Sequence, residues 1–356
     1  MSANNPGQNN AIAGALTFPS RSQDPQPLPE QPRQPRNLQG LLRFAMEATK
    51  AEDAPGPSEL GPMDEERRKF LEEALRSLTV DVAQVLQDSI KILSDAEKIH
   101  GIQLGEPLPE DVSNAFTTLM DFIDDMDIAN DFYKLGGFAI FPVCYGSENE
   151  DVRAKASFVL AELCQNNPFC QARALESGLL NVLLNLVQTE RGEALVKCIY
   201  AISCACREYP PAITELVSQG GCASLAALCA CADPRARTKA AFLVRHLCDH
   251  ASEAREKFVQ LNLIRTLGEQ IQNGRDQTSE HLLGTMVTLV ADLDQRVLAQ
   301  CRDPTLGLRG TLEKHLKHPD LKEDRFREEI DYCQEILCKV FLNRPDEVNN
   351  VEEADR

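Results

Sequence analysis

The chain has 356 residues, of which 43% are hydrophobic, so it can form an extended core and is not disordered throughout. Its net charge of -18 makes nucleic acid or an anionic membrane an unfavourable partner for the molecule as a whole. The sequence shows no signal-peptide pattern and no apolar run of about 18 residues, and its thirteen cysteines lie mostly in helical patterns, as reduced thiols do. These features predict a cytoplasmic protein without disulfides.

The N-terminal region is rich in Pro, Gln and Asn, and we expect residues 1–62 to form a disordered arm. Within this arm, apolar residues spaced three and four apart predict a short amphipathic helix at 37–49. A helix beginning at Asp64 and a second from Val80 to His100 are expected to form an N-terminal helical cap over residues 63–108.

Residues 109–293 repeat at a constant interval of 42 residues. Each unit reads as a short helix ending at glycine, an apolar helix, and a longer third helix, an order that favours armadillo over two-helix HEAT repeats. We therefore expect an all-α, armadillo-type right-handed superhelical solenoid. Helices at Leu306–Leu316 and Arg325–Leu342 would form a C-terminal cap over 294–342, followed by an acidic tail at 343–356. The repeated positions are Gly136, Gly178 and Gly220; Lys155, Lys197 and Lys239; Phe158, Tyr200 and Phe242; and Cys164, Cys206 and Cys248.

Helical periodicity assigns two sides to the third helix. Ala156, Leu163 and Cys164 fall on the side of Leu160, which predicts that this side is buried. The opposite sides of successive third helices would line a concave wall, and aromatic residues recurring there indicate a protein-binding surface. The residues predicted to bind a partner are Phe116, Lys155, Phe158, Glu162, Lys197, Tyr200, Cys204, Arg207, Lys239, Phe242, His246 and His281. Two simpler interpretations stay open, in which the rings are wedged between adjacent third helices and the lysines are only solvated.

Motifs for chemistry are lacking, and we predict neither an enzyme nor a cofactor or metal site. No G-x-x-x-x-G-K-[ST] phosphate loop occurs. The two C-x-C pairs would point apart on a helix, and His246 with His250 lacks the further ligand that a zinc site needs. Cys164 and Cys206 lie on the predicted buried side, where a thiol makes a poor nucleophile.

Several segments together resemble the armadillo-type nucleotide exchange factors, the cytosolic binding proteins of seventy-kilodalton heat-shock chaperones. The resemblance runs from about Pro35 to Phe341 and is carried by Arg36–Leu42, Met63–Arg68, Asp125–Phe132, Ala201–Glu208 and Arg302–Leu308. It implies a monomeric co-chaperone whose concave face grips the chaperone ATPase domain and loosens ADP, and whose N-terminal arm competes for the substrate groove. The alternative is an armadillo scaffold that joins proteins without acting on nucleotide exchange.

Overall fold

The computed structural model describes residue 69 and residues 81–342. The chain divides into two units, Met1–Val80 and Asp81–Arg356, and the fold below is that of the second. The predicted arm at 1–62 with its helix at 37–49, the helix expected from Asp64 and the tail at 343–356 lie outside the described residues.

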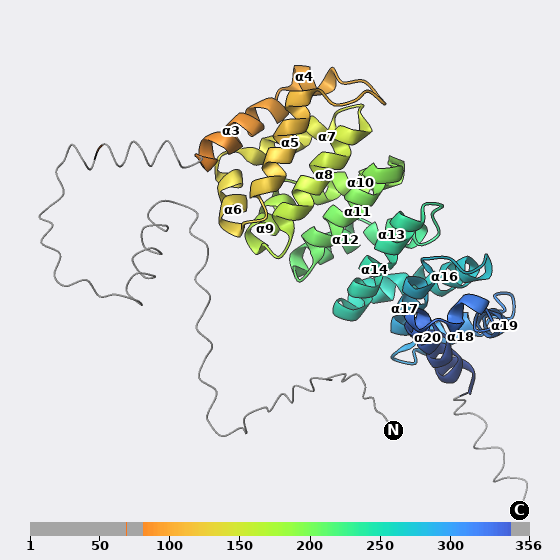
Figure 1. Cartoon of the computed structure of the whole chain (residues 1–356). Helices are drawn as coiled ribbons and strands as arrows, with labels where there is room; N and C mark the ends of the chain where they lie inside the picture. Colours follow the sequence, from red (N-terminus) through yellow and green to blue (C-terminus); the bar gives the residue numbers. More distant parts are fainter. Residues whose placement is uncertain (1–68, 70–80, 343–356) are drawn as a thin grey trace, which may run out of the picture. The chain divides into compact units, whose positions relative to one another are not determined.

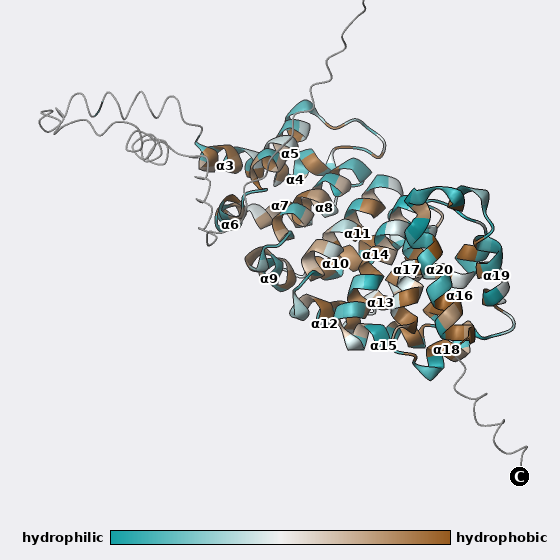
Figure 2. Cartoon of the chain, turned by 60° about the horizontal axis from the view of Figure 1, so that its bottom comes forward, coloured by the Kyte–Doolittle hydropathy of each residue, from teal (hydrophilic) through white to brown (hydrophobic). Residues whose placement is uncertain are grey.

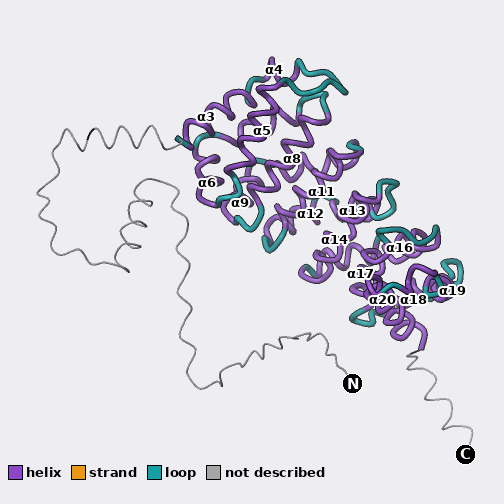
Figure 3. Tube along the Cα trace, viewed as in Figure 1, coloured by secondary structure: helices purple, strands orange, loops and turns teal. Residues whose placement is uncertain are grey.

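Residues 81–342 fold into helices joined by turns, and no strand occurs among them (Figures 1 and 3). Six of the helices described follow one another side by side along the unit, each packed on the one before it. We call these the third helices: α5 (Glu110–Phe122), α8 (Glu150–Cys164), α11 (Gly192–Cys206), α14 (Pro234–His250), α17 (Ser279–Val290) and α20 (Arg327–Leu337).

Two shorter helices precede each third helix from α8 onward, as the repeat predicts. The first of each pair is α6 (Met126–Lys134), α9 (Pro168–Glu176), α12 (Pro210–Ser218), α15 (Ser252–Gln260) or α18 (Gln295–Cys301). The second is α7 (Ile140–Tyr145, after the 3-10 turn η1 at Gly137–Ala139), α10 (Leu179–Thr189), α13 (Gly221–Leu228), α16 (Leu263–Gln272) or α19 (Leu308–His315).

A residue with left-handed backbone conformation separates the first helix from the second in every one of these units. Glycine adopts this conformation without a Cβ penalty, which explains why it recurs at this position. Asn262 takes the same conformation, with φ of 54°, where the repeat has no glycine. The other members of the series are Gly136 (φ 83°), Gly178 (φ 70°), Gly220 (φ 75°) and Gly307 (φ 56°).

The N-terminal end of the described unit differs from prediction in one respect. The helix expected from Val80 to His100 is two helices, α3 (Val82–Leu93) and α4 (Ala96–His100). The break lies at Asp95, whose carboxylate accepts a hydrogen bond from the backbone N–H of Lys98 at 3.1 Å. An aspartate at this position caps a new helix, so it favours a restart over continuation.

The C-terminal end is also more broken than predicted. In place of one helix over Arg325–Leu342, the 3-10 turn η3 (Asp324–Phe326) leads into α20, and a π-helical turn, η4 (Cys338–Leu342), follows. A further 3-10 turn, η2 (Pro319–Lys322), lies between α19 and η3. Together α18, α19 and α20 repeat the three-helix order of the preceding units.

The core runs between the helices along the whole described unit. Ala156, Leu163 and Cys164 are completely buried, which confirms the predicted inner side of the third helix. Brown and teal residues are interspersed along the helices in Figure 2, as expected for helices that bury one side only.

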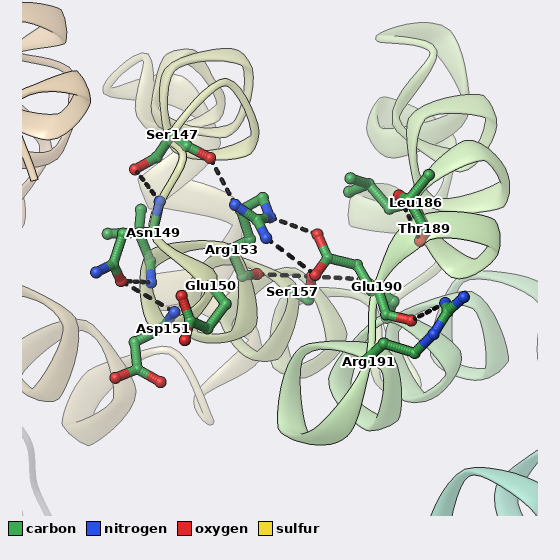
Figure 4. Close-up of polar contacts among 12 residues, drawn as sticks. Ser147, Asn149, Glu150, Asp151, Arg153, Ser157, Leu186, Thr189, Glu190 and Arg191 are labelled. Atoms are coloured by element: carbon green, nitrogen blue, oxygen red, sulfur yellow. Dashed lines mark hydrogen bonds and ion pairs between the residues drawn. The ribbon is translucent and has the colours of Figure 1, made fainter. Parts of the chain in front are cut away.

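A buried ion pair joins two successive repeats (Figure 4). The Arg153 guanidinium on α8 pairs with the Glu190 carboxylate, which precedes α11, through Nε to Oε1 and through Nη2 to Oε2 at 3.0 Å. Nη1 of Arg153 also donates to the Ser147 carbonyl at 2.7 Å. These contacts fix the start of one third helix against the start of the next.

Candidate partner-binding surface

Ten of the twelve side chains predicted to bind a partner are half-buried or exposed, nine of them on successive third helices and Arg207 at the C-cap of α11. We call this surface the third-helix face: Lys155, Phe158, Glu162, Lys197, Tyr200, Arg207, Lys239, Phe242, His246 and His281. It spans α8, α11, α14 and α17, so it crosses four consecutive repeats.

The remaining two predicted residues are buried, and their assignment to the surface is wrong. Phe116 is 1% exposed, because α5 is packed between α3 and α8 and its ring joins the core. Cys204 is 7% exposed, because α11 is packed between α8 and α14. Burial raises the pKa of the Cys204 thiol to about 11, which also makes it a weak nucleophile at neutral pH.

The lysine row and the aromatic row interlock across the helices. Nζ of Lys197 lies 3.6 Å from the ring centroid of Phe158, which belongs to the preceding third helix. Nζ of Lys239 lies 4.8 Å from the ring centroid of Tyr200 in the same way. A cation over an aromatic ring is attracted by the negative face of that ring. Each lysine therefore covers the ring one repeat before it.

The rings themselves differ in exposure along the row. Phe158 and Tyr200 are half-buried, with their centroids 6.2 Å apart, so they are partly wedged between helices as the simpler interpretation held. Phe242 is 54% exposed, and its neighbour across the helices is His281, whose ring centroid lies 4.9 Å away. Phe242 is consequently the most accessible ring of the third-helix face.

The Tyr200 hydroxyl ties α11 to α8. It lies 3.1 Å from Oε1 of Glu162, to which it donates, and also 3.1 Å from Oε1 of Gln165. Burial, with the nearby Cys204 and the Glu162 carboxylate, raises the pKa of the phenol well above its usual range. Tyr200 therefore stays neutral and keeps its proton as a hydrogen-bond donor.

A pair of histidines lies further along the face on α14. The rings of His246 and His250 are stacked with centroids 4.3 Å apart. Burial lowers the pKa of His246, and the neighbouring His250 and Arg207 lower it further. His246 is therefore neutral at pH 7, and its Nε2 is a buried atom without a hydrogen-bond partner in the described structure.

Several cations of this region lack an acidic partner. Within residues 81–342, Lys155, Arg207 and Lys239 form no ion pair, whereas Lys197 lies 3.8 Å from Glu193. In a chain with net charge -18, unpaired cations gathered on one surface are available to an acidic partner.

Other possible sites for chemistry carry little support. No group of three His, Cys, Asp or Glu side chains in the described region is placed to hold a metal ion. All thirteen cysteines are free, and burial raises the pKa of the Cys206 thiol to about 12. None of the helices described is long and apolar enough to cross a membrane.

Comparison with solved structures agrees with the repeat architecture. A designed armadillo repeat protein in complex with the peptide (KR)4 superposes with a TM-score of 0.56 at 14% identity, covering 73% of this chain and 100% of that one. A second designed armadillo repeat protein gives a TM-score of 0.55 at 15% identity, covering 72% and 99% of the two chains. At these identities the likeness shows the fold alone.

The sequence also matches two protein-family models and several individual proteins. The family model described as "Nucleotide exchange factor Fes1" matches residues 38–132. A second family model, described as "SIL1/FES1/HPBP1 C-terminal domain", matches residues 128–235. The chain is 29% identical to Hsp70-binding protein 1 of Mus musculus over 89% of each chain. It is 28% identical to Hsp70 nucleotide exchange factor fes-1 of Neurospora crassa, over 37% of this chain and 51% of the relative.

Fold and surface together define an all-α armadillo-type solenoid with an aromatic and cationic face on its third helices. The two family matches overlap at residues 128–132 and together span residues 38–235, more than half of the 356 residues. The chain belongs to the SIL1/FES1/HPBP1 family.

Proposed function

We propose that this protein is a nucleotide exchange factor of a cytosolic Hsp70, acting as a monomeric co-chaperone and not as an enzyme. It binds the Hsp70 ATPase domain through the third-helix face, promotes ADP release and thereby releases substrate. The names of its relatives support the partner and the activity. Free thiols at all thirteen cysteines agree with a reducing compartment such as the cytosol.

The observation that carries the choice of surface is the interlocked row of rings and cations on α8, α11, α14 and α17. Aromatic residues anchor protein interfaces, and the unpaired Lys155, Arg207 and Lys239 suit an acidic partner surface. We further propose that this face is the concave side of the solenoid.

The mechanism follows from binding linkage. A partner drives ADP release only if it binds the open ATPase domain more tightly than the closed, ADP-holding one. ADP must then weaken the binding of this protein by the same factor. This chain needs no catalytic group for that task, only more contacts with one of the two conformations.

The test is the rate of release of labelled ADP from a purified Hsp70 ATPase domain, followed by stopped flow. A saturating amount of the full chain is expected to accelerate release at least about tenfold, which requires about 1.4 kcal/mol of differential binding. Tight binding with an unchanged rate of ADP release would instead identify a scaffold without exchange activity.

Phe242 provides a sharper test of the surface. Replacing Phe242 by Ala is expected to weaken binding to the Hsp70 ATPase domain by about 1–3 kcal/mol, measured by titration calorimetry, if this ring is an interface anchor. The melting temperature should change little, because the side chain is already 54% exposed.

The matched control is Phe169 on α9, a first helix outside the third-helix face, whose side chain is 37% exposed. Phe169→Ala should bind like the unchanged protein. Equal affinities for all three proteins would remove Phe242 from the interface.

A further inference from the structure

The aromatic row has a gap at its C-terminal end. The 42-residue interval that relates Phe158, Tyr200 and Phe242 next falls on Gly284 of α17, which has no side chain. A Cβ added to Gly284 would lie 2.8 Å from Nη1 of Arg245 and 3.3 Å from Cε2 of Tyr332. The space of the missing ring is therefore taken by Arg245 from α14 and Tyr332 from α20.

These two side chains meet across an intervening helix. Nη1 of Arg245 donates a hydrogen bond to the Tyr332 hydroxyl at 3.2 Å, and the guanidinium carbon lies 5.5 Å from the Tyr332 ring centroid. The helices α14 and α20 each pack on α17, which separates them. Arg245 can reach Tyr332 because Gly284 presents no side chain at the crossing point.

The guanidinium is held in place and retains unused hydrogen-bonding capacity. Arginine has five N–H donors, and Arg245 uses one of them on Tyr332. No acidic side chain within residues 81–342 forms an ion pair with Arg245. The Tyr332 hydroxyl in turn donates a hydrogen bond to Oε2 of Glu328 at 3.4 Å. A positioned guanidinium with free donors suits bidentate recognition of a carboxylate.

Arg245 also lies beside the third-helix face. On α14 it stands one helical turn from Phe242 and next to His246, and the unpaired Lys239 belongs to the same helix. The arginine and Tyr332 add a third cation–ring contact to those that Lys197 and Lys239 make, in the opposite order along the chain, since Tyr332 follows Arg245.

We propose that Arg245, held on Tyr332 across Gly284, is a specificity-determining residue that binds a carboxylate of the partner protein. The partner-binding surface then extends over α17 onto α20. The helix α20 would thus contact the partner, in addition to its predicted role in the C-terminal cap. This inference rests on the proposed function for the identity of the partner.

The first test is Arg245→Gln in the full chain, with binding to the Hsp70 ATPase domain as the measurement. Removing the charge is expected to weaken binding about tenfold, and the dependence of affinity on salt should become flatter. Tyr332→Ala, which removes the support, should weaken binding in the same direction. The double variant should lose less than the product of the two single losses, because both changes remove one unit.

Gly284→Ala tests the crossing point, since its methyl group would displace the arginine from the tyrosine. Its structural control is Gly268→Ala on α16, where an added Cβ would lie 2.9 Å from Cδ1 of Leu306, away from the third-helix face. Gly310→Ala on α19, with nothing within 4 Å of the added Cβ, controls for the substitution itself. Binding should fall about tenfold for Gly284→Ala and stay unchanged for the two control variants.

The outcomes separate this inference from the proposed function. If the unchanged protein binds without accelerating ADP release, the proposed exchange activity fails, but the variants still test the surface through binding. If Arg245→Gln and Tyr332→Ala are folded by circular dichroism and bind like the unchanged protein, the inference is overturned. Should Gly284→Ala fail to fold, Arg245→Gln decides the matter alone.

Discussion

Replacing Glu190 by Ala is expected to lower the free energy of unfolding by about 3–5 kcal/mol, because it leaves the Arg153 guanidinium buried without its counter-charge. The side chains of Arg153 and Glu190 are only 16% and 5% exposed. The pKa of Arg153 is raised, first of all by its hydrogen bond with Glu190, so this partner stabilises the charged guanidinium. The contact also joins α8 to the start of α11, so its loss weakens the packing of two repeats.

The measurement is urea unfolding followed by helical circular dichroism. Glu193→Ala is the matched control, since Glu193 pairs with Arg235 where both side chains are at least half exposed, at 50% and 57%. A surface ion pair of this kind contributes about 0–1 kcal/mol. Unfolding midpoints that coincide for Glu190→Ala and Glu193→Ala would show that the buried pair adds nothing to stability.

The second large effect is expected at Phe116. Replacing Phe116 by Ala should cost about 3–5 kcal/mol of stability, because its ring is completely buried and its removal leaves a cavity between helices. Thermal unfolding measures this loss, and the comparison is Phe242→Ala at the equivalent position of α14, which should unfold close to the unchanged protein.

The comparison of the two variants tests which rings of the aromatic row are buried and which are exposed. Equal losses of stability for Phe116→Ala and Phe242→Ala would mean that both rings are buried in solution, contrary to the 1% and 54% exposures of the structure. Binding measured below the melting temperature of each variant separates the two roles. Folded Phe116→Ala should bind the Hsp70 ATPase domain normally.

Much of the fold could be predicted from the sequence because it depends on local patterns. The 42-residue interval places the helices, and the left-handed residues at Gly136, Gly178 and Gly220 end the first helix of each unit. The buried side of α8, with Ala156 and Leu163, follows from helical periodicity alone. These features depend on residues that are close together in the sequence, so they can be predicted from the sequence alone.

The break at Asp95 is an intermediate case. Apolar spacing favours one helix from Val80 to His100, whereas the Asp95 carboxylate satisfies the N–H of Lys98 and starts α4. The capping residue was visible in the sequence. The sequence alone does not decide whether Asp95 starts a new helix or the apolar stripe continues as one helix. The packing of α4 on α7, which lies about one repeat further along the chain, favours the new helix.

The exposure of the predicted partner-binding residues could be predicted least well from the sequence, because it depends on the tertiary structure. A helical wheel assigns Phe116, Cys204 and Phe242 to the same side of their helices, yet the first two are buried and the third is exposed, because neighbouring helices cover that side to different extents. The contact of Arg245 with Tyr332 joins residues 87 positions apart and depends on a missing side chain at Gly284. The sequence by itself determined the repeat, its helices and their inner sides, since these follow from local backbone preference and periodicity. Only the tertiary structure decided which outward side chains stay accessible, because accessibility depends on the atoms that distant helices bring across them.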